Sequence, residues 1–106
     1  MNFGIPAKSM DLIIEAMAEY EEIERAAIFG SRSMGNYKNG SDVDIAIYGN
    51  DITMELVKRL SIKLNEILPL PYYFDIVHYE SLKNEELKKH IDVFGKVFYI
   101  RKEGTN

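Results

Sequence analysis

The segment Asp42–Tyr48 reads DVDIAIY and alternates between two kinds of side chain. Because successive side chains of a β-strand point to opposite faces, a valine and two isoleucines share one face, and Asp42 and Asp44 lie on the other. An apolar strand face has to be buried against another layer of secondary structure. The segment therefore predicts a strand that carries the core on one side and two neighbouring carboxylates on the other.

The rest of the sequence predicts helices and further strands around this one. Apolar residues recur at helical spacing in two long stretches, and several short apolar runs suit strands. Glycine, serine and asparagine are dense between Gly30 and Gly40 and indicate a loop or a short helical turn. In chain order we expect a helix over about 8–20 with Ser9 as its N-cap, strands over 25–29 and 42–48, a helix over about 56–67, a strand over 72–79, a helix over about 84–91 and an edge strand over 97–100.

This order predicts an α/β (α+β) fold in which helices pack on one face of a small mixed β-sheet. The 106 residues fit a single domain, residues 1–106. The 13 basic and 17 acidic residues leave a net charge of −4, which argues against direct binding to a nucleic-acid backbone. The chain has no cysteine, so disulfides and Cys-ligated zinc are excluded. Without a signal-peptide pattern or a membrane-length apolar run, we expect a soluble, cytoplasmic protein with no membrane partner.

Asp42 and Asp44 are the first candidates for chemistry. Two carboxylates side by side repel each other, and a bound cation relieves that repulsion. Mg²⁺ prefers oxygen ligands and commonly takes one or two carboxylates together with substrate phosphates. The pair therefore predicts a Mg²⁺ site for a nucleoside triphosphate. The simpler alternative is an acidic turn followed by an exposed strand edge.

A glycine-serine turn precedes this pair. Ten residues separate Gly30-Ser31 from Asp42. A glycine after an apolar strand allows a sharp turn and a close approach of the backbone to a ligand. Ser31 would cap a helical turn whose N–H groups face phosphate, and Arg32 would add a forked donor to the phosphate oxygens. Taken alone, this turn fits an ordinary loop equally well.

A third aspartate, Asp75, lies inside the apolar run YYFDIV, where an unpaired buried charge is costly. If its strand lies beside the strand of Asp42 and Asp44, three carboxylates converge, and such a set can hold two metal ions and activate an attacking hydroxyl. The alternative is an edge aspartate that faces water. His78 and His90 fit no zinc-ligand spacing, so we expect ordinary strand and helix roles for them.

Together these residues resemble the signature of the nucleotidyltransferase superfamily that includes DNA polymerase β and kanamycin nucleotidyltransferase. Its smallest branch, the minimal nucleotidyltransferases, has Gly-Ser, ten residues, Asp-x-Asp and a later Asp within an apolar strand. Here these are Gly30-Ser31, Asp42-Val43-Asp44 and Asp75. The stretches GSRSMGNYKNGSDVDIAIYG and IDVFGKVFYI are also similar to the family, so the resemblance spans nearly the whole chain. It implies a polymerase β-like nucleotidyltransferase fold.

The resemblance also implies a role for each residue of the signature. Asp42 and Asp44 would bind the metal ions that hold the triphosphate, with Mg²⁺ as the cofactor. Asp75 would help to bind the second metal and act as base toward the acceptor hydroxyl. Gly30 and Ser31 would cradle the outer phosphates. Attack on the α-phosphorus would then expel pyrophosphate.

The implied activity is transfer of NMP, as AMP from ATP, to a hydroxyl acceptor. The minimal branch resembles the antitoxin half of toxin–antitoxin pairs, whose toxin is a small helical RNase of the HEPN family. The implied acceptor is a tyrosine of that toxin. One alternative is a non-catalytic antitoxin, a binding module that neutralises a helical partner by covering it. Another is a transferase for small molecules such as aminoglycosides, which the lack of a separate acceptor domain in these residues disfavours.

Overall fold

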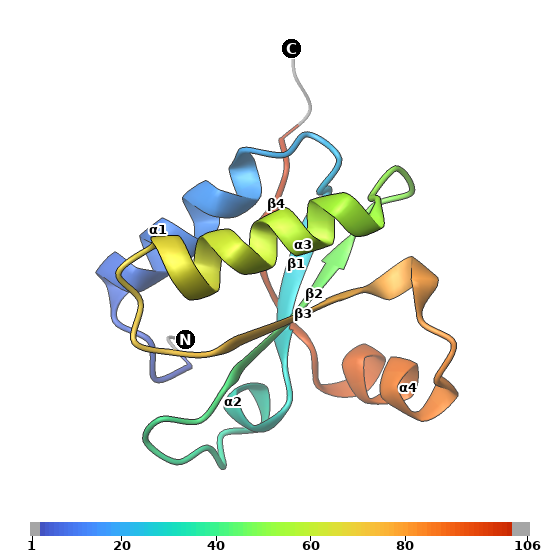
Figure 1. Ribbon diagram of the computed structural model, residues 1–106. Helices are drawn as coiled ribbons and strands as arrows, with labels where there is room; N and C mark the ends of the chain where they lie inside the picture. The colour runs from blue at the N-terminus through green and yellow to red at the C-terminus, as the bar shows by residue number, and fades with distance from the viewer. Residues whose placement is uncertain (1–2, 103–106) are drawn as a thin grey trace.

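A four-stranded sheet forms the centre of the protein, and the computed structural model describes residues 3–102 (Figure 1). The described elements are α1 (Ala7–Ala18), β1 (Arg25–Phe29), α2 (Ser31–Met34), β2 (Val43–Tyr48), α3 (Met54–Ile62), the π-helical turn η1 (Lys63–Ile67), β3 (Phe74–His78), the 3₁₀ turn η2 (Tyr79–Ser81), α4 (Glu85–Phe94) and β4 (Lys96–Ile100). The order of elements expected from the sequence is confirmed, and the segment after β1 contains the short helix α2.

The sheet has the strand order β3-β2-β1-β4, so β2 lies in its interior. Strand β2 runs antiparallel to β1 and parallel to β3, and β4 pairs antiparallel with the other side of β1. A parallel pair needs a crossover connection, which α3 supplies between β2 and β3. The predicted mixed sheet is therefore confirmed, with β4 as an edge strand.

The two helices α1 and α3 cover one face of the sheet (Figure 1). Their apolar side chains form one buried cluster with the strands; Met17 from α1, Leu60 from α3 and Ile45 from β2 are fully buried in it. Removing such side chains from water is the main stabilising contribution to a fold of this size.

Helix α4 lies on the opposite face, so the expectation that helices pack on one face holds only for α1 and α3. The reason is that this second face also contains apolar residues. Phe29 and Ala46 are buried there together with Ile91 of α4. An apolar patch of this kind has to be covered, and α4 covers it.

The helix ends differ in detail from the expected ones. Helix α1 begins after Pro6, so Ser9 lies within the helix and does not cap it. Thr53 caps α3 and Asn84 caps α4, each through a side-chain oxygen that accepts a backbone N–H from the first turn. Within residues 3–102, no helix is long and apolar enough to cross a membrane.

Candidate active site

Asp44 and Asp75 lie opposite each other on two neighbouring strands. The parallel register of β2 and β3 pairs them directly, so both side chains project from the same face of the sheet. Their neighbours Val43 and Phe74 point the other way and are buried with α1 and α3. Asp42 lies just before β2 and is exposed. The chain thus brings Asp44 and Asp75 together on the face that α1 and α3 leave open.

Two neighbouring carboxylates act electrostatically on Asp44. Burial raises the pKa of the Asp44 carboxyl above its ordinary value, and the negative charges of Asp75 and Asp42 raise it further. Because the negative charges of Asp75 and Asp42 both act on Asp44, a cation bound beside Asp44 would be stabilised.

The donor chemistry of these residues fits Mg²⁺. Among residues 3–102, no group of three or more His, Asp or Glu side chains is already arranged to hold a metal ion. Mg²⁺ does not require a closed protein cage, because it usually takes one or two carboxylates and completes its coordination with water and substrate phosphates. Asp44 and Asp75 offer two carboxylates on an open face, and Asp42 lies beside them.

Gly30 turns the chain at the end of β1, next to Asp44. Its φ of +77° lies in the region that favours glycine. A Cβ at this position would also overlap the carboxylate of Asp44. The preceding residue, Phe29, pairs with Asp44 across β1 and β2, which explains the close approach. Only a glycine therefore allows the turn and the carboxylate to occupy neighbouring space.

Ser31 is the first residue of α2 and not its N-cap, which is Gly30. The prediction that Ser31 caps this turn is therefore wrong. The Ser33 hydroxyl instead closes the turn by donating to the Gly30 carbonyl at 2.9 Å. Ser31 is partly exposed, and it begins a helix whose first backbone N–H groups lack partners within the helix. Its hydroxyl and these N–H groups form the polar part of the turn.

Arg32 has a structural position that differs from the predicted phosphate contact. Its side chain is only 3% exposed. The guanidinium donates to the carbonyl of Phe3 at 2.9 Å and twice to the carbonyl of Ser41, at 3.1 and 2.8 Å. The rings of Tyr37 and Tyr72 lie 5.0 and 5.1 Å from it. Arg32 therefore anchors the residue before Asp42 to the N-terminal segment, and its guanidinium donates to backbone carbonyls.

The sequence pattern did not identify His90 as part of this site. Its Nε2 accepts the backbone N–H of Gly30 at 3.0 Å, across 60 positions of sequence. The one available signal was that His90 precedes the buried Ile91 on a short amphipathic helix. His78, by contrast, lies in β3 with its ring nitrogens at 2.7 Å from the Gly49 carbonyl and 2.6 Å from the Ser81 hydroxyl, which is an ordinary structural role.

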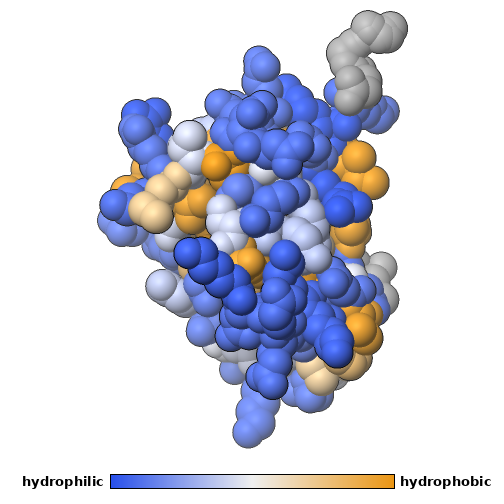
Figure 2. Space-filling model, turned by 90° about the vertical axis from the view of Figure 1, so that its right-hand side faces the viewer, coloured by the Kyte–Doolittle hydropathy of each residue, from blue (hydrophilic) through white to orange (hydrophobic). Residues whose placement is uncertain are grey.

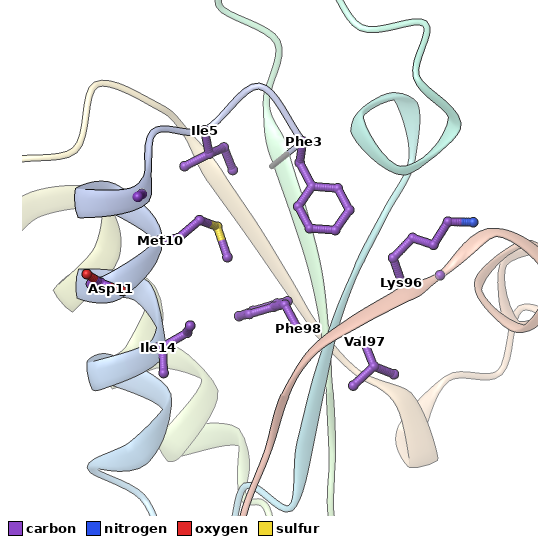
Figure 3. Close-up of a pocket in the computed structure, with 10 residues that line it drawn as sticks. Phe3, Ile5, Met10, Asp11, Ile14, Lys96, Val97 and Phe98 are labelled. Carbon is purple, nitrogen blue, oxygen red and sulfur yellow. The ribbon is translucent and has the colours of Figure 1, made fainter. Parts of the chain in front are cut away.

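An apolar groove of about 740 Å³ lies in a different part of the molecule, between α1 and β4 (Figure 3). Phe3, Met10 and Phe98 line it, with Asp11 and Lys96 near its ends. Its lining includes none of Asp42, Asp44 and Asp75, and no residue of the glycine-serine turn. The groove is therefore separate from the candidate active site.

Comparison with known families decides the class of the protein. A family model described as polymerase beta, nucleotidyltransferase matches residues 11–104, which is most of the chain. The chain belongs to this nucleotidyltransferase family. The resemblance inferred from Gly30-Ser31, Asp42, Asp44 and Asp75 is thereby confirmed at the level of the family. A comparison with curated proteins gives no match.

Solved structures of toxin–antitoxin complexes share the fold of this nucleotidyltransferase. A chain of a toxin–antitoxin complex with AMP-PNP gives a TM-score of 0.71 at 24% identity, covering 87% of this chain and 73% of that one. A chain of the MntA–HepT complex gives 0.69 at 20% identity, with 91% and 74% covered. A chain of the tri-AMPylated Shewanella oneidensis HEPN toxin in complex with MNT antitoxin gives 0.67 at 22% identity, with 89% and 71% covered. At these identities the likeness shows the fold, and the predicted fold class is confirmed.

Proposed function

We propose that this protein is a Mg²⁺-dependent nucleotidyltransferase that transfers AMP from ATP to a tyrosine hydroxyl of a small helical HEPN toxin, and so acts as its antitoxin. The observation that carries the proposal is the pairing of Asp44 with Asp75 beside the Gly30 turn. The AMP-PNP and the tri-AMPylated HEPN toxin of the structural neighbours support the choice of ATP and of a protein acceptor.

In this proposal Asp42, Asp44 and Asp75 hold Mg²⁺, which when bound neutralises charge on the triphosphate. Ser31 and the N–H groups at the start of α2 bind the outer phosphates. Asp75 takes the proton of the acceptor hydroxyl, because it is the more exposed member of the central pair. The hydroxyl oxygen then forms a bond to the α-phosphorus, the bond from that phosphorus to the bridging oxygen breaks, and pyrophosphate leaves.

The position of the pair also bears on the kind of acceptor. Asp75 lies on β3, at the edge of the sheet, and is exposed. The side of the molecule that lies to the right in Figure 1, where α4 is, has a mostly hydrophilic surface without one broad apolar patch (Figure 2). A side chain of a bulky partner can therefore approach Asp75 from outside the sheet, as transfer to a protein hydroxyl requires.

The proposal is tested by mass spectrometry of the partner. The protein is co-expressed with a small helical protein of the HEPN family, sought first in the neighbouring reading frame, and the purified partner is also incubated with this protein, ATP and Mg²⁺ in vitro. We expect the partner to gain the mass of AMP on a tyrosine, and to gain none when EDTA replaces Mg²⁺. CTP, GTP and UTP in parallel reactions establish the nucleotide. An unmodified partner in both settings would contradict the transferase activity.

A non-catalytic antitoxin is the second candidate, and a specific observation favours it. Met34, Tyr73 and Phe94 are large apolar side chains exposed by 46, 60 and 39%. Each belongs to a segment next to the site: α2, the residues before β3, and α4. Exposed apolar residues of this kind suit a protein interface. If the unmodified partner is still bound and neutralised, covering alone accounts for the antitoxin effect.

A further inference from the structure

A hydrogen bond between His90 and Gly30 ties α4 to the turn that begins α2. The Gly30 N–H donates to Nε2 of His90 at 3.0 Å in a partly buried setting. An imidazole nitrogen that accepts a hydrogen bond carries no proton, so this contact assigns the ring proton to Nδ1. The backbone of the turn is therefore fixed by a residue from a distant part of the chain.

Two aromatic side chains hold the imidazole in place. Phe29 meets the His90 ring edge-on with 6.0 Å between the ring centroids, and Phe94 lies against it at 5.2 Å. Phe29 directly precedes Gly30, whereas Phe94 is one helical turn after His90. The ring therefore cannot swing away from the Gly30 N–H without losing aromatic packing on both elements.

The turn needs such a restraint because it is built on glycine. A glycine has access to many backbone conformations, so the positive φ of Gly30 has to be maintained by its surroundings. On one side the Asp44 carboxylate occupies the space that a Cβ at position 30 would need. On the other side the Gly30 N–H donates a hydrogen bond to His90. A partly buried N–H without an acceptor is costly, so loss of the imidazole would favour rotation of the turn.

We propose that His90 is a positioning residue for the nucleotide: it holds the Gly30-Ser31 turn in the conformation that presents Ser31 to the triphosphate. The inference rests on the proposed function, in which Ser31 binds the outer phosphates. The Gly30 N–H then does not donate to phosphate, because it already donates to Nε2 of His90. Helix α4 becomes part of the nucleotide site, although the sequence signature of the family contains no residue from it.

Three variants separate this role from simple packing. His90→Leu keeps an apolar side chain against Phe29 but removes the acceptor. His90→Gln restores an acceptor of similar reach. Lys89→Gln changes an exposed neighbour on the same helix and serves as the matched control. Circular dichroism establishes that each variant is folded; if His90→Leu is not, His90→Asn, which is polar but too short to reach Gly30, replaces it.

The first measurement needs no nucleotide. Hydrogen exchange by NMR should show the Gly30 amide exchanging about fivefold faster in His90→Leu, which corresponds to one lost hydrogen bond. The rate should stay near that of the wild type in His90→Gln and Lys89→Gln. The ¹⁵N shifts of the wild-type His90 ring should report a proton on Nδ1.

The second measurement is the affinity for ATP with Mg²⁺. His90→Leu should weaken binding about fivefold and raise the KM for ATP, while kcat at saturating ATP changes less. His90→Gln should recover most of the affinity. This pattern differs from general destabilisation, which would not be rescued by an acceptor alone.

Several results would overturn the inference. One is an unchanged Gly30 exchange rate in the folded acceptor-free variant, and another is a His90→Gln protein that behaves like His90→Leu. A third is normal affinity for Mg²⁺-ATP in a variant that has lost the Gly30 protection. If the wild type itself binds no Mg²⁺-ATP, the proposed function fails instead, and Gly30 exchange with the amide shift of Ser31 still decides whether His90 holds the turn.

Discussion

The two faces of the sheet are made by the same strands but have opposite properties. Toward α1 and α3, strand β2 presents Val43, Ile45 and Ile47, which are completely buried. On its other face the same strand begins with the partly exposed Asp44 and continues with the buried Ala46. Because side chains alternate between the two faces of a strand, one face of β2 can stabilise the fold while the other carries the residues for chemistry. Substitutions on the two faces should have separable effects.

The largest expected effect is on the open face. Asp44→Asn or Asp75→Asn is nearly isosteric and removes one charge where the transferring phosphate needs compensation. We expect transfer of AMP to the partner to fall by about 10²–10³ for either variant. Denaturation midpoints should stay within a few degrees of the wild type, and quantitative mass spectrometry of the partner gives the rate.

Asp51→Asn is the matched control, because Asp51 is an exposed aspartate in the turn between β2 and α3. It should transfer AMP at the wild-type rate. Both active-face variants should still bind the partner, because interface energy comes mainly from buried anchors. If either of them retains full transfer, the roles assigned to the two carboxylates are wrong.

The next effect belongs to the buried face. Ile45→Ala leaves a cavity between the sheet and its two covering helices, and we expect a loss of about 3 kcal/mol in the free energy of unfolding. Urea denaturation measures it. Ile62→Ala, at a position 46% exposed on α3, should cost less than about 0.5 kcal/mol. At a temperature where Ile45→Ala is folded, its affinity for Mg²⁺-ATP should match the wild type; a large loss would show that the faces are coupled.

The sequence predicts one of these faces better than the other. The alternation of residues 42–48 was enough to predict strand β2, its buried side and the carboxylates on its other side. It depends only on local geometry, so no long-range contact has to be known. The sharp turn at Gly30 was predicted for the same reason, because a glycine directly after an apolar strand is a local signal for such a turn.

Two features of the active face depend on contacts distant in sequence, and the pattern did not reveal them. Helix α4 covers Phe29 and Ala46, so one helix lies on a face that was expected to have none. The sequence predicts Arg32 as a phosphate donor, because guanidinium groups often bind phosphate. Its actual partners are backbone carbonyls of Phe3 and Ser41, whose positions follow only from the folded chain.

A smaller effect concerns the glycine-serine turn. Ser31→Ala removes one hydroxyl from the start of α2, and we expect affinity for Mg²⁺-ATP to fall by about 1 kcal/mol. Isothermal calorimetry measures it, with EDTA abolishing binding in both proteins because the acidic site repels free ATP. Ser9→Ala, inside α1, is the control and should bind as the wild type does. Equal affinity of the Ser31→Ala protein would remove Ser31 from the phosphate site.

The smallest effect has the opposite sign to that of Ile45→Ala, and it comes from Asp44 in the absence of metal. Burial, and then the charges of Asp75 and Asp42, raise the pKa of Asp44 from its ordinary value of 3.8. The folded protein therefore holds this proton more tightly than the unfolded chain does. The stability that this proton contributes is fully present below pH 3.8, and it is lost as the pH rises through the folded-state pKa of Asp44.

The Asp44→Asn variant has no such proton to lose. In EDTA, its free energy of unfolding minus that of the wild type should therefore increase between about pH 3 and about pH 7. The gain should be modest, because Asp44 is only partly buried and solvent screens its charge. Mg²⁺ should narrow the difference at about pH 7 by stabilising the wild type, since the ion compensates the carboxylates that repel each other. Urea denaturation at the two pH values, with and without Mg²⁺, measures this. If the wild type instead becomes the more stable protein as the pH rises in EDTA, the carboxylates are not in mutual repulsion, and the electrostatic reason for placing a metal ion on this face is lost.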